Sequence, residues 1–270
     1  MSAEAGHASF FFCIPLQPKA NANNWERVCA VLNQTLRSIQ NQKNQNFTVF
    51  LAGQDRPDIE PDIKVKVNWL QADWTVQNAN NEKLRDKRRK RIILLRAVRE
   101  AGGGYVMMLD ADDLVSNQLV EYVLTDRNPN GYIIERGYAY DWGNGCIAPI
   151  PGAWSKTFDS VCGSCSVIKY GVDDLPPARS AETEEGARHL AMQLKQHSQW
   201  KHVMSDLGRP LAVIPFPAAV YVLNHSNNLH YSIKAMRQEE VPLRIAKRKL
   251  PVTPELSQEF SLPAAPVAGS

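Results

Sequence analysis

The most restrictive feature of this sequence is an apolar run that ends in a cluster of carboxylates. Residues 105–109 form the run, and Asp110-Ala111-Asp112-Asp113 follows it directly. Gly102-Gly103-Gly104 precedes the run and supplies the left-handed backbone conformations that commonly end a helix. A short apolar run between a helix stop and a polar turn predicts a buried strand. Its acids would then lie at the edge where α/β sheets place ligands.

The spacing of the acids favours a metal site. Residues i and i+2 of an extended segment point the same way, so Asp110 and Asp112 would lie side by side. Their charges repel unless a cation lies between them, and hard ions such as Mg²⁺ or Mn²⁺ prefer oxygen ligands. Aspartates at strand ends also commonly cap the next helix or form turns, with no chemistry attached. That alternative suits Asp113, and Ser116 is an equally good cap for the following helix.

Strands and helices alternate along the first half of the chain. The apolar run of residues 10–14 ends at Pro15, and Asn24 is a plausible cap for the amphipathic helix that follows. Strand, helix, strand implies a parallel pair with a right-handed crossover. The expected strands are residues 10–14, 47–52, 65–70 and 105–109, and the expected helices are residues 25–39 and 84–100.

The second half has a different texture. Asn144-Gly145 is a strong hairpin-turn signal. From about residue 241 the chain is basic and then rich in Pro, Ala and Ser, which predicts a tail with little core of its own. The expected strands are residues 131–134, 138–142, 166–168, 211–214 and 220–223, and the expected helices are residues 117–124 and 187–194. We therefore divide the chain at residues 1–115, 116–240 and 241–270.

Composition narrows the class of protein. The 270 residues are 44% hydrophobic, enough to bury a substantial core, and the net charge of +3 is low for a dedicated nucleic-acid protein. No apolar stretch has the length of a bilayer span. Five scattered cysteines do not form a disulfide framework, so we expect a soluble protein of the reducing cytosol. Cys162-Gly163-Ser164-Cys165 lacks a second metal-binding pair, which favours a structural turn.

The order of these parts resembles the nucleotide-sugar-dependent glycosyltransferases of the GT-A fold, most closely family 2. The resemblance covers about residues 10–228. It rests on the strand ending at Pro15, the helix around residues 35–39, the strand that opens at Asn46-Phe47, and above all residues 104–113. It implies a Rossmann-like, mostly parallel mixed sheet flanked by helices. Residues 1–115 would then bind the nucleotide sugar, and residues 116–240 the acceptor.

The resemblance also implies an activity. Such enzymes move a hexose or similar sugar from a nucleoside-diphosphate sugar, here a UDP- or GDP-sugar, to a hydroxyl of a glycan or polysaccharide precursor. By position, Asp110 and Asp112 inherit the contacts to the nucleotide and to Mn²⁺ or Mg²⁺. His225 stands where relatives often supply a third metal contact, and His230 is a weaker substitute. Pro15 would line the nucleotide site.

Two departures from the family pattern affect the assignment of roles. The second strand usually ends in acids that contact the base or ribose, whereas this chain has Gly53-Gln54, with Asp55 just beyond. Asp55 is therefore the expected nucleotide contact, from a shifted position. The catalytic base of inverting members commonly belongs to an acidic pair that opens a late helix. Here Glu184 and Glu185 take that place.

The base assignment has alternatives. Acids also favour the first turn of any helix because of its dipole, so Glu185 is the expected base and Glu184 its neighbour, with Asp159 or Asp173 as substitutes. Trp142 and Trp154 could stack on a sugar acceptor, although single tryptophans more often pack in the core.

A basic run at residues 83–91 precedes the acidic motif. Lys87 and Arg91 are four residues apart, so they share a helical face and are expected to approach the diphosphate. A sugar–diphosphate bond breaks with growing negative charge on the leaving group, which cations stabilise. The other members of the run are expected on a solvated face.

Other classes of protein fit less well. A sugar-nucleotide pyrophosphorylase needs a glycine-rich loop after the first strand, where this chain has Pro15-Leu16-Gln17-Pro18, and Leu114-Val115 does not suit an aspartyl phosphatase. From a different class, the basic runs at residues 83–91 and 244–249 would suit a non-catalytic module that binds nucleic acid or an anionic surface. We expect no nucleic acid, and a peripheral membrane contact stays open.

Overall fold

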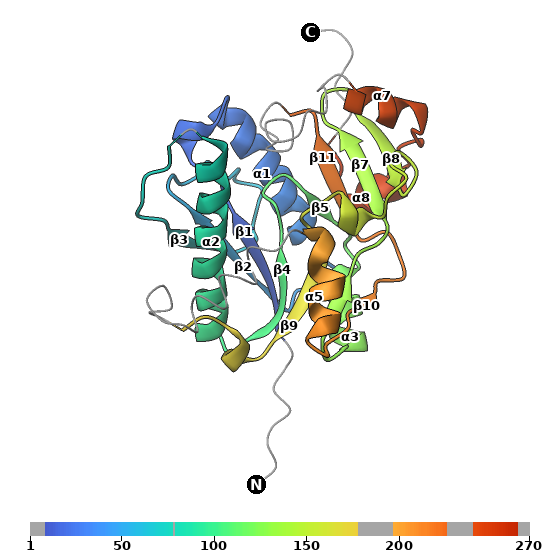
Figure 1. Ribbon diagram of the computed structural model, residues 1–270. Helices are drawn as coiled ribbons and strands as arrows, with labels where there is room; N and C mark the ends of the chain where they lie inside the picture. Colours follow the sequence, from blue (N-terminus) through green and yellow to red (C-terminus); the bar gives the residue numbers. More distant parts are fainter. Residues whose placement is uncertain (1–8, 78, 178–196, 226–239, 264–270) are drawn as a thin grey trace.

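The computed structural model describes residues 9–77, 79–177, 197–225 and 240–263. It is an α/β structure with a mixed sheet flanked by helices, as the sequence predicts (Figure 1). The main sheet has seven strands in the order β10-β6-β9-β4-β1-β2-β3, and a second sheet has four in the order β5-β11-β7-β8. The predicted helix at residues 187–194 lies outside the described residues.

The main sheet is built around a wholly buried strand. β1 (Phe10–Pro15) pairs in parallel with β2 and β4 on its two sides. β9 runs antiparallel between β4 and β6, which makes the sheet mixed. The other strands of this sheet are β2 (Phe47–Gly53), β3 (Val67–Gln71), β4 (Gly104–Met108), β6 (Gly131–Ile133), β9 (Ser166–Tyr170) and β10 (Ala212–Val213).

Helices follow the predicted pattern with shifted ends. Asn24 caps α1 (Trp25–Gln40) as predicted, since its side chain accepts from the Arg27 amide at 2.8 Å. α2 (Asn80–Glu100) begins four residues before the predicted start and lies across one face of the main sheet (Figure 1). α3 (Leu119–Asp126) begins two residues later than expected and has no side-chain cap. Among the described residues, the next α-helix after α3 is α5 (Trp200–Asp206).

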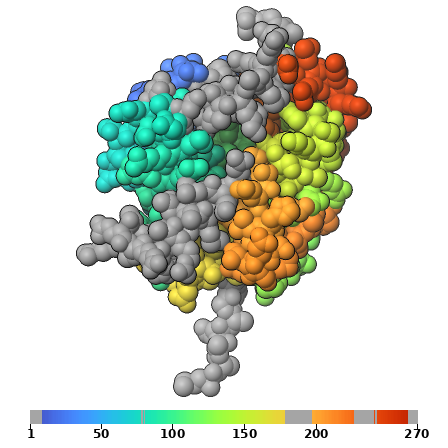
Figure 2. All heavy atoms as spheres, in the orientation of Figure 1, coloured from blue at the N-terminus to red at the C-terminus, as the bar shows by residue number. Residues whose placement is uncertain are grey.

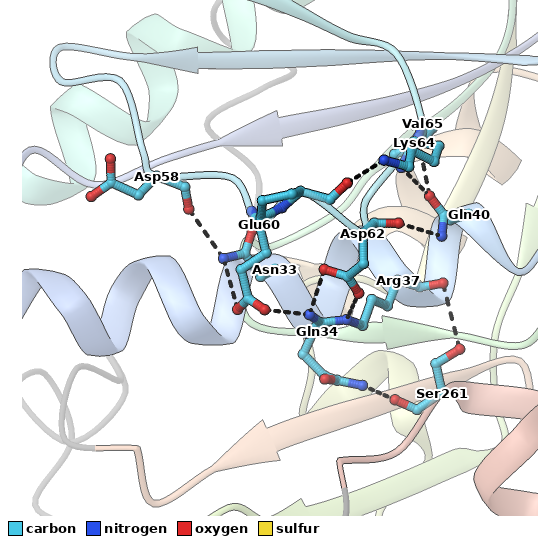
Figure 3. Close-up of polar contacts among 11 residues, drawn as sticks. Asn33, Gln34, Arg37, Gln40, Asp58, Glu60, Asp62, Lys64, Val65 and Ser261 are labelled. Carbon is cyan, nitrogen blue, oxygen red and sulfur yellow. Dashed lines mark hydrogen bonds and ion pairs between the residues drawn. The ribbon is translucent and has the colours of Figure 1, made fainter.

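The segment between β2 and β3 is tied to α1 by a polar network (Figure 3). The Arg37 guanidinium donates to both carboxylate oxygens of Asp62, at 3.0 and 3.1 Å, and its hydrogen bond lowers the pKa of Asp62. Asn33 donates to the Asp58 carbonyl at 3.1 Å, and Gln40 accepts from the Val65 amide at 3.1 Å. Each exposed contact alone contributes little to stability, so the segment is held against α1 by the contacts together.

The second sheet confirms the predicted hairpin. β7 (Gly137–Asp141) and β8 (Cys146–Ile150) pair antiparallel, and Gly145 adopts a positive φ of 63° in the turn. β11 (Ala219–Leu223) is the expected strand. It pairs with β7 and with a short strand that was not predicted, β5 (Leu114–Val115).

The predicted tail is wrong in one respect, because its first part has a core. α7 (Glu240–Lys247) and α8 (Pro254–Phe260) pack against the domain, with Ile245 and Phe260 fully buried. The Asn117 amide donates to the Glu259 carbonyl at 3.0 Å. The sequence did not predict these two short helices, because prolines and charged residues interrupt their apolar pattern. The division of the chain into halves stays a prediction.

A buried ion pair joins α2 to three loops. The Lys90 ammonium lies 2.6 Å from a carboxylate oxygen of Asp86 and donates to the Leu16 carbonyl at 2.6 Å. The other oxygen of Asp86 accepts from Gln54 and Trp74, each at 2.9 Å. The Lys90 side chain is 1% exposed, and burial lowers its pKa against the opposing effect of Asp86. The prediction of a solvated face is therefore wrong for Lys90.

Replacing Lys90 by Met should destabilise the fold strongly, because the Asp86 carboxylate would stay buried without its counter-charge. We expect the free energy of unfolding in urea to fall by about 3–5 kcal/mol. Arg85→Met is the matched control, since the Arg85 side chain is 72% exposed, and it should change stability by less than about 0.5 kcal/mol. Equal losses in the two variants would refute this role for the pair.

Candidate metal and nucleotide site

Three carboxylates meet where β4 ends. Oxygens of Asp110, Asp112 and Asp113 all lie within 4.8 Å of one another. β4 is buried and runs parallel to β1, so both strands end at the same edge of the sheet. The turn after β4 carries all three acids at that edge. Like charges this close must be offset by donors or cations. Each of the three is offset differently.

Asp110 is neutralised by the basic face of α2. The Lys87 ammonium lies 2.6 Å from its carboxylate, and the Asp110 amide donates to the Ser164 hydroxyl at 2.9 Å. Burial acts to raise the pKa of Asp110, but the charges of Lys87 and Arg91 outweigh it and hold that pKa below its ordinary value. Asp110 is therefore an anion held against a lysine.

Asp112 faces the end of β11. An imidazole nitrogen, Nε2, of His225 lies 2.9 Å from its carboxylate. The His225 side chain is only 4% exposed, whereas that of Asp112 is 28% exposed. Asn224 precedes the histidine with a positive φ of 61°, and its side chain donates to Asp141 at 2.7 Å. This turn holds an imidazole beside an accessible carboxylate, and the metal contact expected of His225 stays a prediction.

Asp113 is a structural carboxylate, as the sequence favours, and it lies in a buried turn rather than at a helix cap. It is fully buried and accepts from Ser164 at 2.6 Å, from the Cys162 thiol at 3.1 Å and from the Val222 amide at 3.2 Å. Burial, and then the charges of Asp112 and Asp110, raise the pKa of Asp113 well above its ordinary value. Its oxygens tie the acidic turn to β11 and to the segment before β9.

The segment at residues 162–165 is a part of the site that the sequence did not identify. Its two cysteines are buried free thiols, in keeping with the expected structural turn. At Gly163, an added Cβ would lie 2.8 Å from a carboxylate oxygen of Asp110. Glycine lets this backbone approach Asp110, and Ser164 then reaches two acids. In the sequence, only the run of small residues at 162–165 indicated that the backbone could come this close to another segment.

The other expected nucleotide contacts lie at the same edge. Pro15 is the last residue of β1 and is buried beside Ala52 of β2. The Asp55 carboxylate accepts from the Lys19 amide at 2.8 Å, so it holds the loop after β1. Arg91 lines a small pocket together with Gly163 and Trp200.

The candidates for catalytic base have separate outcomes. Glu184, Glu185 and His230 lie outside the described residues. Asp173 is wrong as a substitute, because it follows β9 at the end beside Gly103, where β4 begins. Six steps of extended chain separate Gly104 from Asp110, which puts Asp173 about 20 Å from the acids.

Asp159 lies on the short 3₁₀ helix η2 (Phe158–Ser160) and is 4% exposed. One of its carboxylate oxygens has no hydrogen-bond partner in the described part of the chain. Trp142 and Trp154 are partly buried and pack against the hydrophobic core, which agrees with the packing alternative.

Comparisons with known proteins give little. No family model and no curated protein matches the sequence. Among solved structures, the chain is similar to one described as a "putative nucleotide-diphospho-sugar transferase from Desulfovibrio desulfuricans G20". The TM-score is 0.32 and the identity 9%, over 88% of this chain and 97% of that chain. Similarity at this level carries no argument, so a function must be argued from the site itself.

A helix that crosses a bilayer must be long and apolar. None of the helices in residues 9–77, 79–177, 197–225 and 240–263 could cross a membrane.

Replacing Gly163 by Ala should damage the site while leaving the fold intact. The new methyl group would push the Asp110 carboxylate away from its place beside Lys87 and Asp112. We expect Mn²⁺ binding, measured by calorimetry, to weaken about 10- to 100-fold. Gly171→Ala is the matched control, since its Cβ would meet its nearest neighbour at 3.6 Å, an ordinary contact. Undiminished binding in Gly163→Ala would contradict the geometry described here.

Proposed function

We propose that this chain is a metal-dependent glycosyltransferase of the GT-A type, which moves a sugar from a nucleoside-diphosphate sugar to a hydroxyl acceptor. The observation that carries the proposal is the arrangement at the end of β4. Asp112 lies beside His225, and Asp110 lies beside Lys87. The pair of Asp112 and His225 offers ligands to a metal ion. The neighbouring pair of Asp110 and Lys87 offers a cation to a diphosphate.

The donor set fits a hard divalent cation. Asp112 and Asp110 supply oxygens, and His225 supplies a nitrogen that Mn²⁺ tolerates well. Because Lys87 already offsets Asp110, we assign the main metal contact to Asp112 and His225. Asp113 is an unsuitable ligand, since three donors occupy its oxygens. A bound Mn²⁺ or Mg²⁺ would stabilise the negative charge that develops on the departing diphosphate.

The protein's own cations would act on the same charge. Lys87 is held in place by Asp110 at 2.6 Å, and Arg91 lies one helical turn further along α2. Both can bind the diphosphate oxygens with little reorganisation, which is what an efficient electrostatic catalyst needs. Asp110 would therefore have two roles, since it supplies an oxygen to the metal and also orients Lys87 toward the nucleotide.

Binding of the nucleoside is assigned to the ends of β1 and β2. Pro15 and Asp55 flank this edge, and Gln54 is fixed there by Asp86. An amide in place of the usual acid changes which groups of a base are recognised. UDP- and GDP-sugars are the donors to test first.

Deprotonation of the acceptor hydroxyl is assigned to Glu185, with Glu184 beside it. A substitute is Asp159, which is buried and carries a carboxylate oxygen without a hydrogen bond in the described residues. The acceptor itself, a glycan or a polysaccharide precursor, would bind against residues 116–240.

The decisive assay measures release of nucleoside diphosphate from a panel of nucleotide sugars, with and without Mn²⁺. We expect turnover to need the metal and to fall on the order of 10²-fold in Asp112→Asn and Lys87→Met. Asp173→Asn is the matched control, because this exposed aspartate lies at the opposite edge of the sheet. Donor binding is measured as well, since hydrolysis without acceptor can be slow. Absence of donor binding in the unaltered protein would refute the proposal.

A further inference from the structure

A basic and apolar surface covers residues 243–252, formed by α7 and the segment after it. Three large hydrophobic side chains are exposed there: Leu243 at 61%, Leu250 at 40% and Val252 at 43%. Lys247, Arg248 and Lys249 are exposed among them. Isolated exposed hydrophobic residues are ordinary, but three of them grouped with cations indicate a binding surface.

This surface is firmly attached to the domain. Ile245 is fully buried beneath α7, and the Leu250 amide donates to the Ile147 carbonyl of β8 at 2.8 Å. The neighbouring side chains are therefore directed outward by the same anchoring. Arg244 lies 3.8 Å from Glu240, so the three later cations carry most of the local excess charge.

The surface lies at the same end of the molecule as the candidate site. The chain enters β1 from the lower end in Figure 1, so the carboxyl edge of the parallel strands faces the upper end, where α7 also lies. Figure 2 shows the atoms of α7 at the surface of that end. A flat partner bound by residues 243–252 would therefore lie at the end of the molecule that also carries the acids.

We infer that residues 243–252 bind an anionic membrane surface. Lysine and arginine are attracted to acidic headgroups, and leucine and valine gain by entering the boundary between headgroups and acyl chains. Nucleic acid would attract the cations but would leave the aliphatic side chains without a partner. If the proposed function is correct, on which this further step rests, the acceptor is a hydroxyl compound attached to a lipid.

The test is co-sedimentation of the full chain with vesicles, in the absence of nucleotide. We expect binding to vesicles that contain phosphatidylglycerol and little binding to phosphatidylcholine alone. Two variants, Leu250→Ser with Val252→Ser and Lys247→Gln with Lys249→Gln, should each weaken binding about tenfold. Leu207→Ser with Val213→Ser is the control. Leu207 follows the end of α5 and is 53% exposed, and Val213 lies on β10 and is 46% exposed, so neither should matter for vesicle binding.

Two outcomes would overturn the inference. One is equal binding by the control and the altered proteins, or no vesicle binding at all. The other is a loss that affects only the charge variant and is matched by an equal loss of duplex DNA binding, which would indicate a nucleic-acid surface. Circular dichroism verifies that each variant is folded. Nucleotide-sugar turnover without vesicles is measured separately, so failure of the membrane inference and failure of the proposed function are distinguishable.

Discussion

Repulsion among three carboxylates is the constraint on which the arrangement of this protein depends. The three acids after β4 lie within 4.8 Å of one another, and each needs its own compensation. Lys87 comes from α2, His225 from the end of β11, and the hydroxyl and thiol donors from the segment before β9. Segments that are far apart in the sequence, from α2 to the end of β11, therefore meet at one turn.

The two sheets divide this work. The main sheet fixes β4 between β1 and β9, so the acidic turn and the donors before β9 come together. The second sheet brings β11 close enough for Val222 to donate to Asp113 and for His225 to reach Asp112. Further along the edge, the buried pair of Lys90 and Asp86 holds the loops after β1, β2 and β3.

Local patterns explain what the sequence could predict. The sequence predicts features that depend on neighbouring residues. These are the strand before the acids, the cap at Asn24 and the turn at Gly145. Helical spacing predicted that Lys87 approaches a diphosphate, which stays a prediction, but its ion pair with Asp110 was not predicted. The family resemblance implied a metal contact for His225, which stays a prediction, and its position beside Asp112 needed the structure. The proximity of Asp110 and Asp112 followed from their spacing, whereas the burial of Asp113 and its three donors needed the structure.

Long-range pairing explains the rest. The insertion of β9 between β4 and β6 brings Ser164 to Asp110 and Asp113, and no local signal specifies that pairing. Lys90 looked like one more solvated charge because its partners, Leu16 and Asp86, are joined only in the folded chain. The core of α7 and α8 was missed because their apolar residues are few and far apart.

The position of a bound metal tests the central claim most directly. Crystals grown with Mn²⁺ and a nucleoside diphosphate should show an anomalous scattering peak between Asp112 and His225, with the diphosphate oxygens near Lys87. A second crystal of Asp112→Asn should lack that peak. Mn²⁺ bound away from both residues, or a diphosphate bound away from the end of β4, would contradict the account.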